Sequence, residues 1–292
     1  MRLKNIFCIA VSVASSLWMT GCVSTTVSGT TASDRKQLMF YPSSWAKYKS
    51  DRSYARFEKI GKENHRYVID PRLNKILDQL VVASQNYMLQ GRKIDWEVRL
   101  NLSSTINAMS LPNGKIVVNS AIAWNKLTDD ELAFLIAHEM SHVLREHARE
   151  RKSISFVSNS AALAVSATGI GQIPAFLTVY SNPYVSTLPM SRVMETEADQ
   201  IGLDLMSRAG FQPQAAISFW GKTRERMKLR GLEYDQYPEF LSSHPDIEER
   251  MNNLQTFMPA AILQYQKAMQ RRSMQPGTED LHTAVNYIHT VK

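Results

Sequence analysis

The chain has 292 residues, of which 44% are hydrophobic, and it carries 34 Lys and Arg against 27 Asp and Glu, for a formal net charge of +7. This length and apolar content exclude a disordered chain and allow one large domain or two modest ones. Basic and acidic residues are interspersed along most of the chain, so we expect a mixed-charge surface and no nucleic-acid partner.

The first 21 residues have the layout of a secretory signal. Two basic residues precede an apolar run from Ile6 to Met19, which is too short to span a bilayer comfortably. The small residues before Cys22 resemble the lipobox of bacterial lipoproteins, which implies cleavage before Cys22 and acylation of its thiol. Val23 stands where inner-membrane lipoproteins usually carry Asp, which by resemblance favours the outer membrane. An ordinary signal peptide with a chance cysteine is the alternative.

Composition divides the chain into four parts. Residues 1–21 are expected to be the signal peptide, and residues 22–36 the lipidated cysteine with a flexible tether, because this stretch is rich in Ser, Thr and Gly. A folded domain is expected over 37–262, followed by a C-terminal tail over 263–292. We expect the lipid to attach the domain to the membrane.

The start of the domain predicts a helix followed by a small sheet. Asp70 is placed to cap a helix that has Pro71 at its first position. Apolar residues alternate with polar ones from Trp96 to Leu102, as in a half-buried strand, and Asn113-Gly114 predicts a hairpin turn. The expected fold class is α+β, mainly helical, with a small antiparallel sheet.

A capping box predicts a helix from about Asp129 to Glu150, which carries an H-E-x-x-H sequence. His138 and His142 are four residues apart, about 40° around the helix, so both imidazoles can reach one ion. Glu139 is placed to accept a proton from water without being a ligand. Two incidental histidines on a solvated helix are the alternative, but apolar neighbours predict buried histidines that need a partner.

Catalytic zinc takes three protein ligands and leaves a position for water, so a third donor is needed. Glu195 is the expected third ligand, and Asp199, four residues later, is expected to hydrogen-bond a ligand histidine. Glu197 points about 200° away from Glu195 around the helix, and we expect it to be a surface carboxylate. Two imidazoles and one carboxylate favour one Zn²⁺ per chain. The histidines outside this pattern are excluded as ligands; they are His65, His147, His282 and His289.

Residues 153–191 contain no charged residue and no histidine. A helical hairpin or flap beside the site is expected there, and a membrane contact is the alternative. Further helices are expected over 192–208, ended by Gly210, and over 213–229. His244, before a proline, is expected to open another.

H-E-x-x-H followed about fifty residues later by E-x-E-A-D resembles the HtpX, LoiP and BepA family of zinc metallopeptidases. The resemblance covers roughly Asp70 to Leu254, and the lipobox makes LoiP-like periplasmic lipoproteins the nearest group. Other stretches that resemble the family pattern are Ile106-Asn107-Ala108, Leu111-Pro112-Asn113-Gly114, Ser191-Arg192, Ala209-Gly210-Phe211 and Ser243-His244-Pro245 before Arg250.

The resemblance implies a gluzincin-like zincin fold in which an edge strand binds the substrate as an added strand. The corresponding residues here are Asn107, Ala108, Met109 and Ser110. It also implies that His244 lies near the metal, either as a ligand or as a group that stabilises the transition state, and that Arg250 supports the site electrostatically. A structural histidine at a helix start is the alternative for His244.

Together these features predict a zinc endopeptidase on the periplasmic side of the outer membrane. Main-chain pairing at an edge strand predicts broad side-chain tolerance, which suits unfolded or misassembled envelope proteins as substrates. Contact with the outer-membrane assembly machinery is a further expectation. The alternatives are an assembly factor or chaperone with little proteolysis, and a structural lipoprotein whose histidines are incidental.

Overall fold

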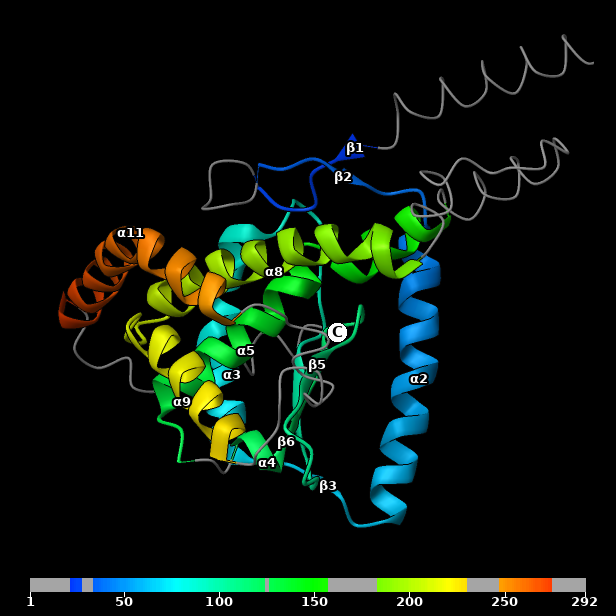
Figure 1. Cartoon of the computed structure of the whole chain (residues 1–292), viewed down its shortest axis with the longest axis horizontal. Coiled ribbons are helices and arrows are strands. Elements are labelled where there is room, and N and C mark those ends of the chain that lie inside the picture. Colours follow the sequence, from blue (N-terminus) through cyan, green and yellow to red (C-terminus); the bar gives the residue numbers. More distant parts are fainter. Residues whose placement is uncertain (1–21, 28–33, 124–125, 157–182, 230–246, 275–292) are drawn as a thin grey trace, which may run out of the picture.

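The computed structural model describes residues 22–27, 34–123, 126–156, 183–229 and 247–274, and helices predominate in it (Figure 1). The long helix α2 stands at one side of the body, with α9 and α11 on the opposite side (Figure 1). The elements in chain order are β1 (Cys22–Val23), β2 (Gln37–Leu38), α2 (Ser43–Glu63), β3 (Tyr67–Val68), α3 (Pro71–Ser84), the short 3₁₀ turn η1 (Gln85–Tyr87), β4 (Glu97–Asn101), β5 (Ala108–Ser110), β6 (Lys115–Asn119), α4 (Ser120–Ala123), α5 (Asp129–Leu144), α8 (Pro183–Arg208), α9 (Ala215–Leu229) and α11 (Ile247–Met274).

The main sheet is mixed and has the strand order β3-β4-β6-β5. β5 and β6 form the hairpin expected at Asn113-Gly114, where Gly114 has a φ of 89° that only glycine adopts readily. β4 and β6 run parallel, with Val98 opposite Ile116, so the expectation of an antiparallel sheet is wrong on this point. β5 follows β4 in the chain but lies at the sheet edge, where it pairs with β6. β6 therefore lies between β4 and β5, parallel to β4 and antiparallel to β5. The α+β class is confirmed.

Two helices begin where their capping residues predict. Asp70 accepts hydrogen bonds from the backbone N–H groups of Arg72 and Leu73, at 2.8 and 3.3 Å, ahead of α3. Thr128 and Glu131 form a reciprocal capping box ahead of α5, with the Glu131 carboxylate accepting from the Thr128 N–H at 2.8 Å. These bonds satisfy N–H groups that a helix start leaves without intrahelical partners.

Helix α5 ends at Leu144 and not near Glu150 as expected. Glu146 has a φ of 51°, which breaks the helical hydrogen-bond ladder, and a new helical segment runs over 147–156. Arg92 stabilises the break, because its guanidinium donates to the carbonyl oxygens of Val143 and Leu144 at 2.9 and 2.7 Å.

Helix α5 forms the centre of the core, and every residue from 131 to 145 is buried. The sheet, α3, α8 and α9 pack around it. Gly202 lets α8 approach closely, since a Cβ there would lie 3.0 Å from the backbone nitrogen of His138. The two helices are thus held in contact at the level of the H-E-x-x-H sequence.

Helix α11 continues to Met274, past residue 262, where the C-terminal boundary of the domain is expected. Ala268 is buried, and Arg272 donates to the Ala209 carbonyl oxygen at 2.7 Å. The first part of the expected tail, residues 263–274, therefore packs on the body.

The N-terminal arm, defined as residues 22–27 and 34–38, packs against the body. Thr25, Thr26 and Gln37 are buried, although the composition of this region is typical of a linker. Their polar groups have partners: Thr25 donates to the Gln37 side chain at 2.7 Å, and Gln37 donates to the Arg145 carbonyl at 2.6 Å. Burial of such residues is favourable only because these bonds are made.

No helix among the described residues is long and apolar enough to cross a bilayer. The expected signal peptide, residues 157–182 of the uncharged stretch, and His244 lie outside the described residues.

Candidate metal centre and active site

Three side chains converge between α5 and α8. His138 and His142 lie one turn apart on α5, with their Nε2 atoms 3.1 Å apart. Glu195 on α8 places one oxygen 3.3 Å from His138 Nε2 and the other 3.5 Å from His142 Nε2. Tetrahedral zinc with bonds near 2 Å separates its ligand atoms by about 3.3 Å. This cluster of expected ligands therefore fits a zinc ion in donor type and spacing.

Two further residues hold the His138 side of the cluster. Asp199 lies four residues after Glu195 and accepts from His138 Nδ1 at 3.1 Å. Arg250, from α11, donates to both oxygens of Asp199 at 2.6 Å and lies 3.3 Å from Glu195. Both residues thus lie beside the cluster. Because Asp199 binds Nδ1 of His138, Nε2 of the same ring faces Glu195.

The charge balance of the cluster favours a cation. Burial lowers the pKa of His138, but hydrogen bonds to Asp199 and Glu195 outweigh burial and raise it to about 9. The pKa of Asp199 is lowered, because its interactions with Arg250 and His138 outweigh burial. Burial lowers the pKa of His142. Carboxylates that favour a proton on His138 also favour a metal cation between the ligands.

His147 contacts the opposite side of His142, which the sequence did not predict. Because α5 breaks after Leu144, His147 is not rotated away as it would be on a continuous helix, and its Nδ1 lies 2.8 Å from His142 Nδ1. Its Nε2 lies 3.1 Å from a Glu197 oxygen. Burial lowers the pKa of His147 to about 3. His147 is not part of the cluster of His138, His142 and Glu195, but it is buried against His142.

Glu197 is also buried, contrary to the expectation of a surface carboxylate. It does point away from Glu195, but that direction leads to His147 and to the guanidinium groups of Arg35 and Arg145. Burial opposes ionisation, yet hydrogen bonds from His147 and Arg35 and the charge of Arg145 lower the pKa of Glu197 to about 2. One helix, α8, therefore supplies carboxylates to both sides of the histidine pair.

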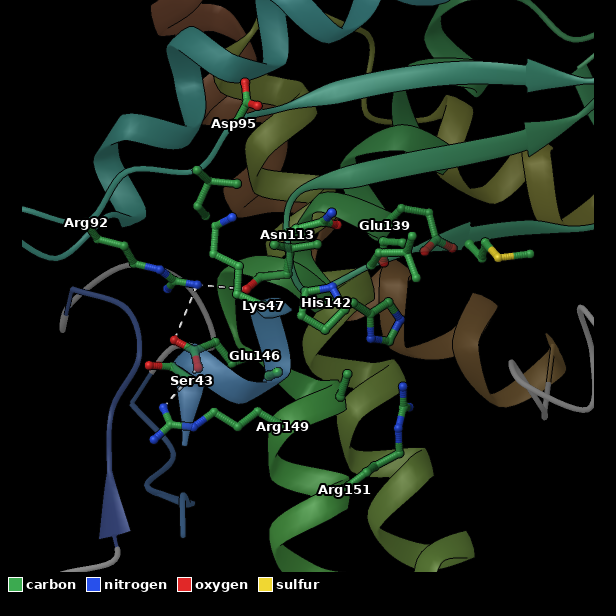
Figure 2. A pocket seen from close by; sticks show the side chains of 18 of the residues that line it. Ser43, Lys47, Arg92, Asp95, Asn113, Glu139, His142, Glu146, Arg149 and Arg151 are labelled. Carbon is green, nitrogen blue, oxygen red and sulfur yellow. Dashed lines mark hydrogen bonds and ion pairs between the residues drawn. The ribbon is translucent and has the colours of Figure 1, made fainter. Parts of the chain in front are cut away.

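The cluster opens into a cleft of about 530 Å³. Glu139 and His142 point into it from α5, as Figure 2 shows, and Glu195 also lines it. One wall is the strand β5 with its flanks, and the opposite wall is the first turn of α2, including Ser43 and Lys47. Glu139 thus lies at the junction of the ligand cluster and an open cleft.

Strand β5 is one of the two edge strands of the described four-stranded sheet, and it borders the cleft. The expected substrate-strand residues all line the cleft, with Asn107 and Ala108 buried and Met109 39% exposed. An extended peptide could therefore lie along β5 within reach of Glu139.

At the cleft mouth, Glu146 forms ion pairs with Arg92 at 3.5 Å and with Arg149 at 2.9 Å (Figure 2). These contacts fix the break after α5. No local sequence signal predicts them, because neither Gly nor Pro marks the break.

The comparisons with known proteins agree with this geometry. A family model described as Peptidase family M48 matches residues 69–258. The chain is 35% identical over 188 residues to the mitochondrial metalloendopeptidase OMA1 of Saccharomyces cerevisiae, covering 63% of this chain and 52% of that protein. It is 30% identical over 179 residues to the human mitochondrial metalloendopeptidase OMA1, covering 58% and 34%.

A bacterial relative is the putative beta-barrel assembly-enhancing protease of Vibrio cholerae. It is 26% identical over 204 residues, covering 66% of this chain and 40% of that protein. The matched part of the chain spans about half or less of the length of these relatives.

Proposed function

Because the chain belongs to Peptidase family M48, we propose that it is a zinc-dependent endopeptidase. The observation that carries this proposal is the convergence of ligand atoms of His138, His142 and Glu195, all within 4.8 Å of one another, at a cleft that also contains Glu139. Zinc held by these three residues would polarise the substrate carbonyl and make water nucleophilic near neutral pH.

The residues of the chain perform the remaining steps. Glu139 accepts a proton from the attacking water and donates it to the leaving amine. Asp199 keeps His138 Nε2 directed at the cluster, and Arg250 balances the buried negative charge. Chelators are expected to inhibit the enzyme because they remove the zinc. Serine reagents are not expected to inhibit it, because no side chain forms a covalent intermediate.

The proposed substrates are misfolded or misassembled envelope proteins. The free edge of β5 beside the cleft supports recognition through main-chain hydrogen bonds, which tolerate many side chains. The name of the Vibrio cholerae relative supports a role near outer-membrane protein assembly. Peptides with N-methylated backbone flanking the scissile bond should resist cleavage, whereas peptides with shuffled side chains should not.

The proposed location is the periplasmic face of the outer membrane, with a lipid on Cys22. The lipobox-like sequence before Cys22 supports this placement. Cys22→Ala should abolish incorporation of labelled fatty acid and release the protein from the membrane fraction. Retention of both would contradict the lipid anchor but not the peptidase.

The decisive experiment compares wild type with Glu139→Gln for zinc content and for cleavage of casein or an unfolded outer-membrane protein. Glu139→Gln should retain stoichiometric zinc and lose activity by about 10²- to 10⁴-fold or more, as expected for a general base. Glu63→Gln, an exposed residue of α2, is the matched control and should behave as wild type. His244→Ala should raise activity if His244 blocks the metal and lower it if His244 stabilises the transition state.

The rival functions make different predictions in the same experiment. Cleavage that survives Glu139→Gln would refute the mechanism. Zinc without cleavage in wild type would favour an assembly factor or chaperone. Absence of zinc from wild type would favour a structural lipoprotein.

A further inference from the structure

The two ligand histidines are supported by different residues on their outer sides. His138 Nδ1 contacts Asp199 directly, whereas His142 Nδ1 contacts a second histidine, His147, which in turn contacts Glu197. His147 is fully buried, and Glu197 is 5% exposed. Water therefore has little access to the bonds that connect Glu197 to His142.

The direction of these hydrogen bonds follows from the chemistry of the groups. An ionised carboxylate can only accept, so the hydrogen between Glu197 and His147 resides on His147 Nε2. A neutral His147 then has a lone pair on Nδ1, and His142 Nδ1 must donate to it. His142 Nε2 is left with its lone pair directed at Glu195 and His138, which is the tautomer that a metal ligand needs.

We propose that His147 and Glu197 are positioning residues that hold His142 in the tautomer protonated on Nδ1, and that Arg35 of the N-terminal arm fixes the outer end of this relay. The relay is the set of hydrogen bonds from Arg35 through Glu197 and His147 to His142. The zinc part of the inference rests on the proposed function.

Arg35 ties the relay to the arm. Its Nε and Nη2 donate to the two oxygens of Glu197 at 2.9 and 2.7 Å, and its Nη1 donates to Glu150 at 2.6 Å. Arg145 completes the contact, donating to the backbone carbonyl of Arg35 at 2.8 Å and to Glu197 at 3.1 Å. A charged network with this many partners holds Glu197 in one orientation.

The arm begins at the cysteine for which a lipid anchor is proposed, and Arg35 lies only 13 positions later in the chain. Displacement of the arm would remove the two hydrogen bonds from Arg35 to Glu197, while the contacts of Glu197 with Arg145 and His147 would remain. We therefore expect the seating of the arm to influence zinc affinity.

The test uses the full-length chain in detergent and two variants at the same position. His147→Asn keeps an amide oxygen near the place of Nδ1 and can still accept from His142, whereas His147→Leu has a similar bulk and no acceptor. Nitrogen NMR of protein with isotope-labelled histidine reports the tautomer of His142 in the metal-free state. Competition with a chromophoric chelator measures zinc affinity, and thermal unfolding of the metal-free protein measures stability.

We expect wild-type His142 to be protonated on Nδ1. His147→Leu should lose about 10- to 100-fold in zinc affinity, as is typical when the residue supporting a metal ligand is removed. His147→Asn should lose less affinity than His147→Leu, because it keeps an acceptor for His142 Nδ1 and loses only the bond to Glu197. Arg35→Gln should lose less than about tenfold. Arg72→Gln, which removes an arginine paired with Asp129 far from the relay, should lose none.

Protonation of wild-type His142 on Nε2 would overturn the proposal, as would equal loss of zinc affinity in the Asn and Leu variants. If His147→Leu does not fold, the wild-type spectrum still decides, because protonation of His142 on Nε2 contradicts the relay whatever the variants do. If wild type binds no zinc, the proposed function fails, while the tautomer of His142 continues to test the relay separately.

Discussion

Replacement of Arg250 by Met should strongly destabilise the metal-free protein. Arg250 is 2% exposed, makes two hydrogen bonds of 2.6 Å to Asp199, and lies over the Trp220 ring at 4.0 Å. Breaking a buried ion pair from one side costs about 3–5 kcal/mol, because the remaining charge stays buried. A desolvated cation–π contact adds about 2 kcal/mol. Met preserves much of the apolar volume, so we expect a loss in unfolding free energy near the top of the 3–5 kcal/mol range.

Urea unfolding of the chelator-treated protein measures this loss. Asp199→Asn in the Arg250→Met background should restore part of the stability, because it removes the buried charge. Arg224→Met breaks an ion pair whose side chains are 41% and 70% exposed, and it should cost less than about 1 kcal/mol. The reasoning is refuted if Arg250→Met costs no more than Arg224→Met, or if the second substitution restores nothing.

Thr128→Ala removes one half of the capping box of α5 and should lower the unfolding free energy by about 1 kcal/mol in urea; an unchanged value would mean that tertiary packing alone fixes the helix start. Gly202→Ala forces a Cβ to within 3.0 Å of the His138 backbone and should cost about 1–3 kcal/mol and weaken zinc binding. Gly221→Ala meets nothing within 4 Å in helix α9, so it should instead gain about 0.5–1 kcal/mol, and thermal unfolding of both variants would expose a wrong sign. The pKa of Glu197 is lowered from 4.5 to about 2, so its contribution to stability is present above pH 4.5 and lost as the pH falls toward 2. Glu197→Gln should reduce this acid dependence in unfolding measured at several pH values, and an unaltered pH profile would contradict the buried contacts of Glu197.

The parts of the fold that the sequence predicted depend on local signals. Asp70 and Thr128 cap helices through bonds to residues within three positions, and Gly114 supplies the positive φ of the hairpin turn. The resemblance to the metallopeptidase family rested on sequence motifs in the same way and is confirmed at the level of the family. Its placement among LoiP-like lipoproteins stays a prediction.

The parts that the sequence did not predict depend on distant partners. The parallel pairing of β4 with β6 is set by the position of β5 at the sheet edge. The break after α5 requires Arg92, which lies more than fifty positions earlier in the chain. Without that break, His147 would be placed on the wrong side of the helix, and neither it nor Glu197 could be connected to His142.

The wide separation of the site residues along the chain has a consequence for biosynthesis. His138 and His142 emerge from the ribosome well before Glu195, and Arg250 lies 112 positions after His138. A partly synthesised chain therefore contains the two histidines but lacks Glu195, Arg250 or both. If the proposed function holds, a chain that still lacks α11 is expected to be inactive, because Arg250 on that helix is not yet beside Asp199 and Glu195.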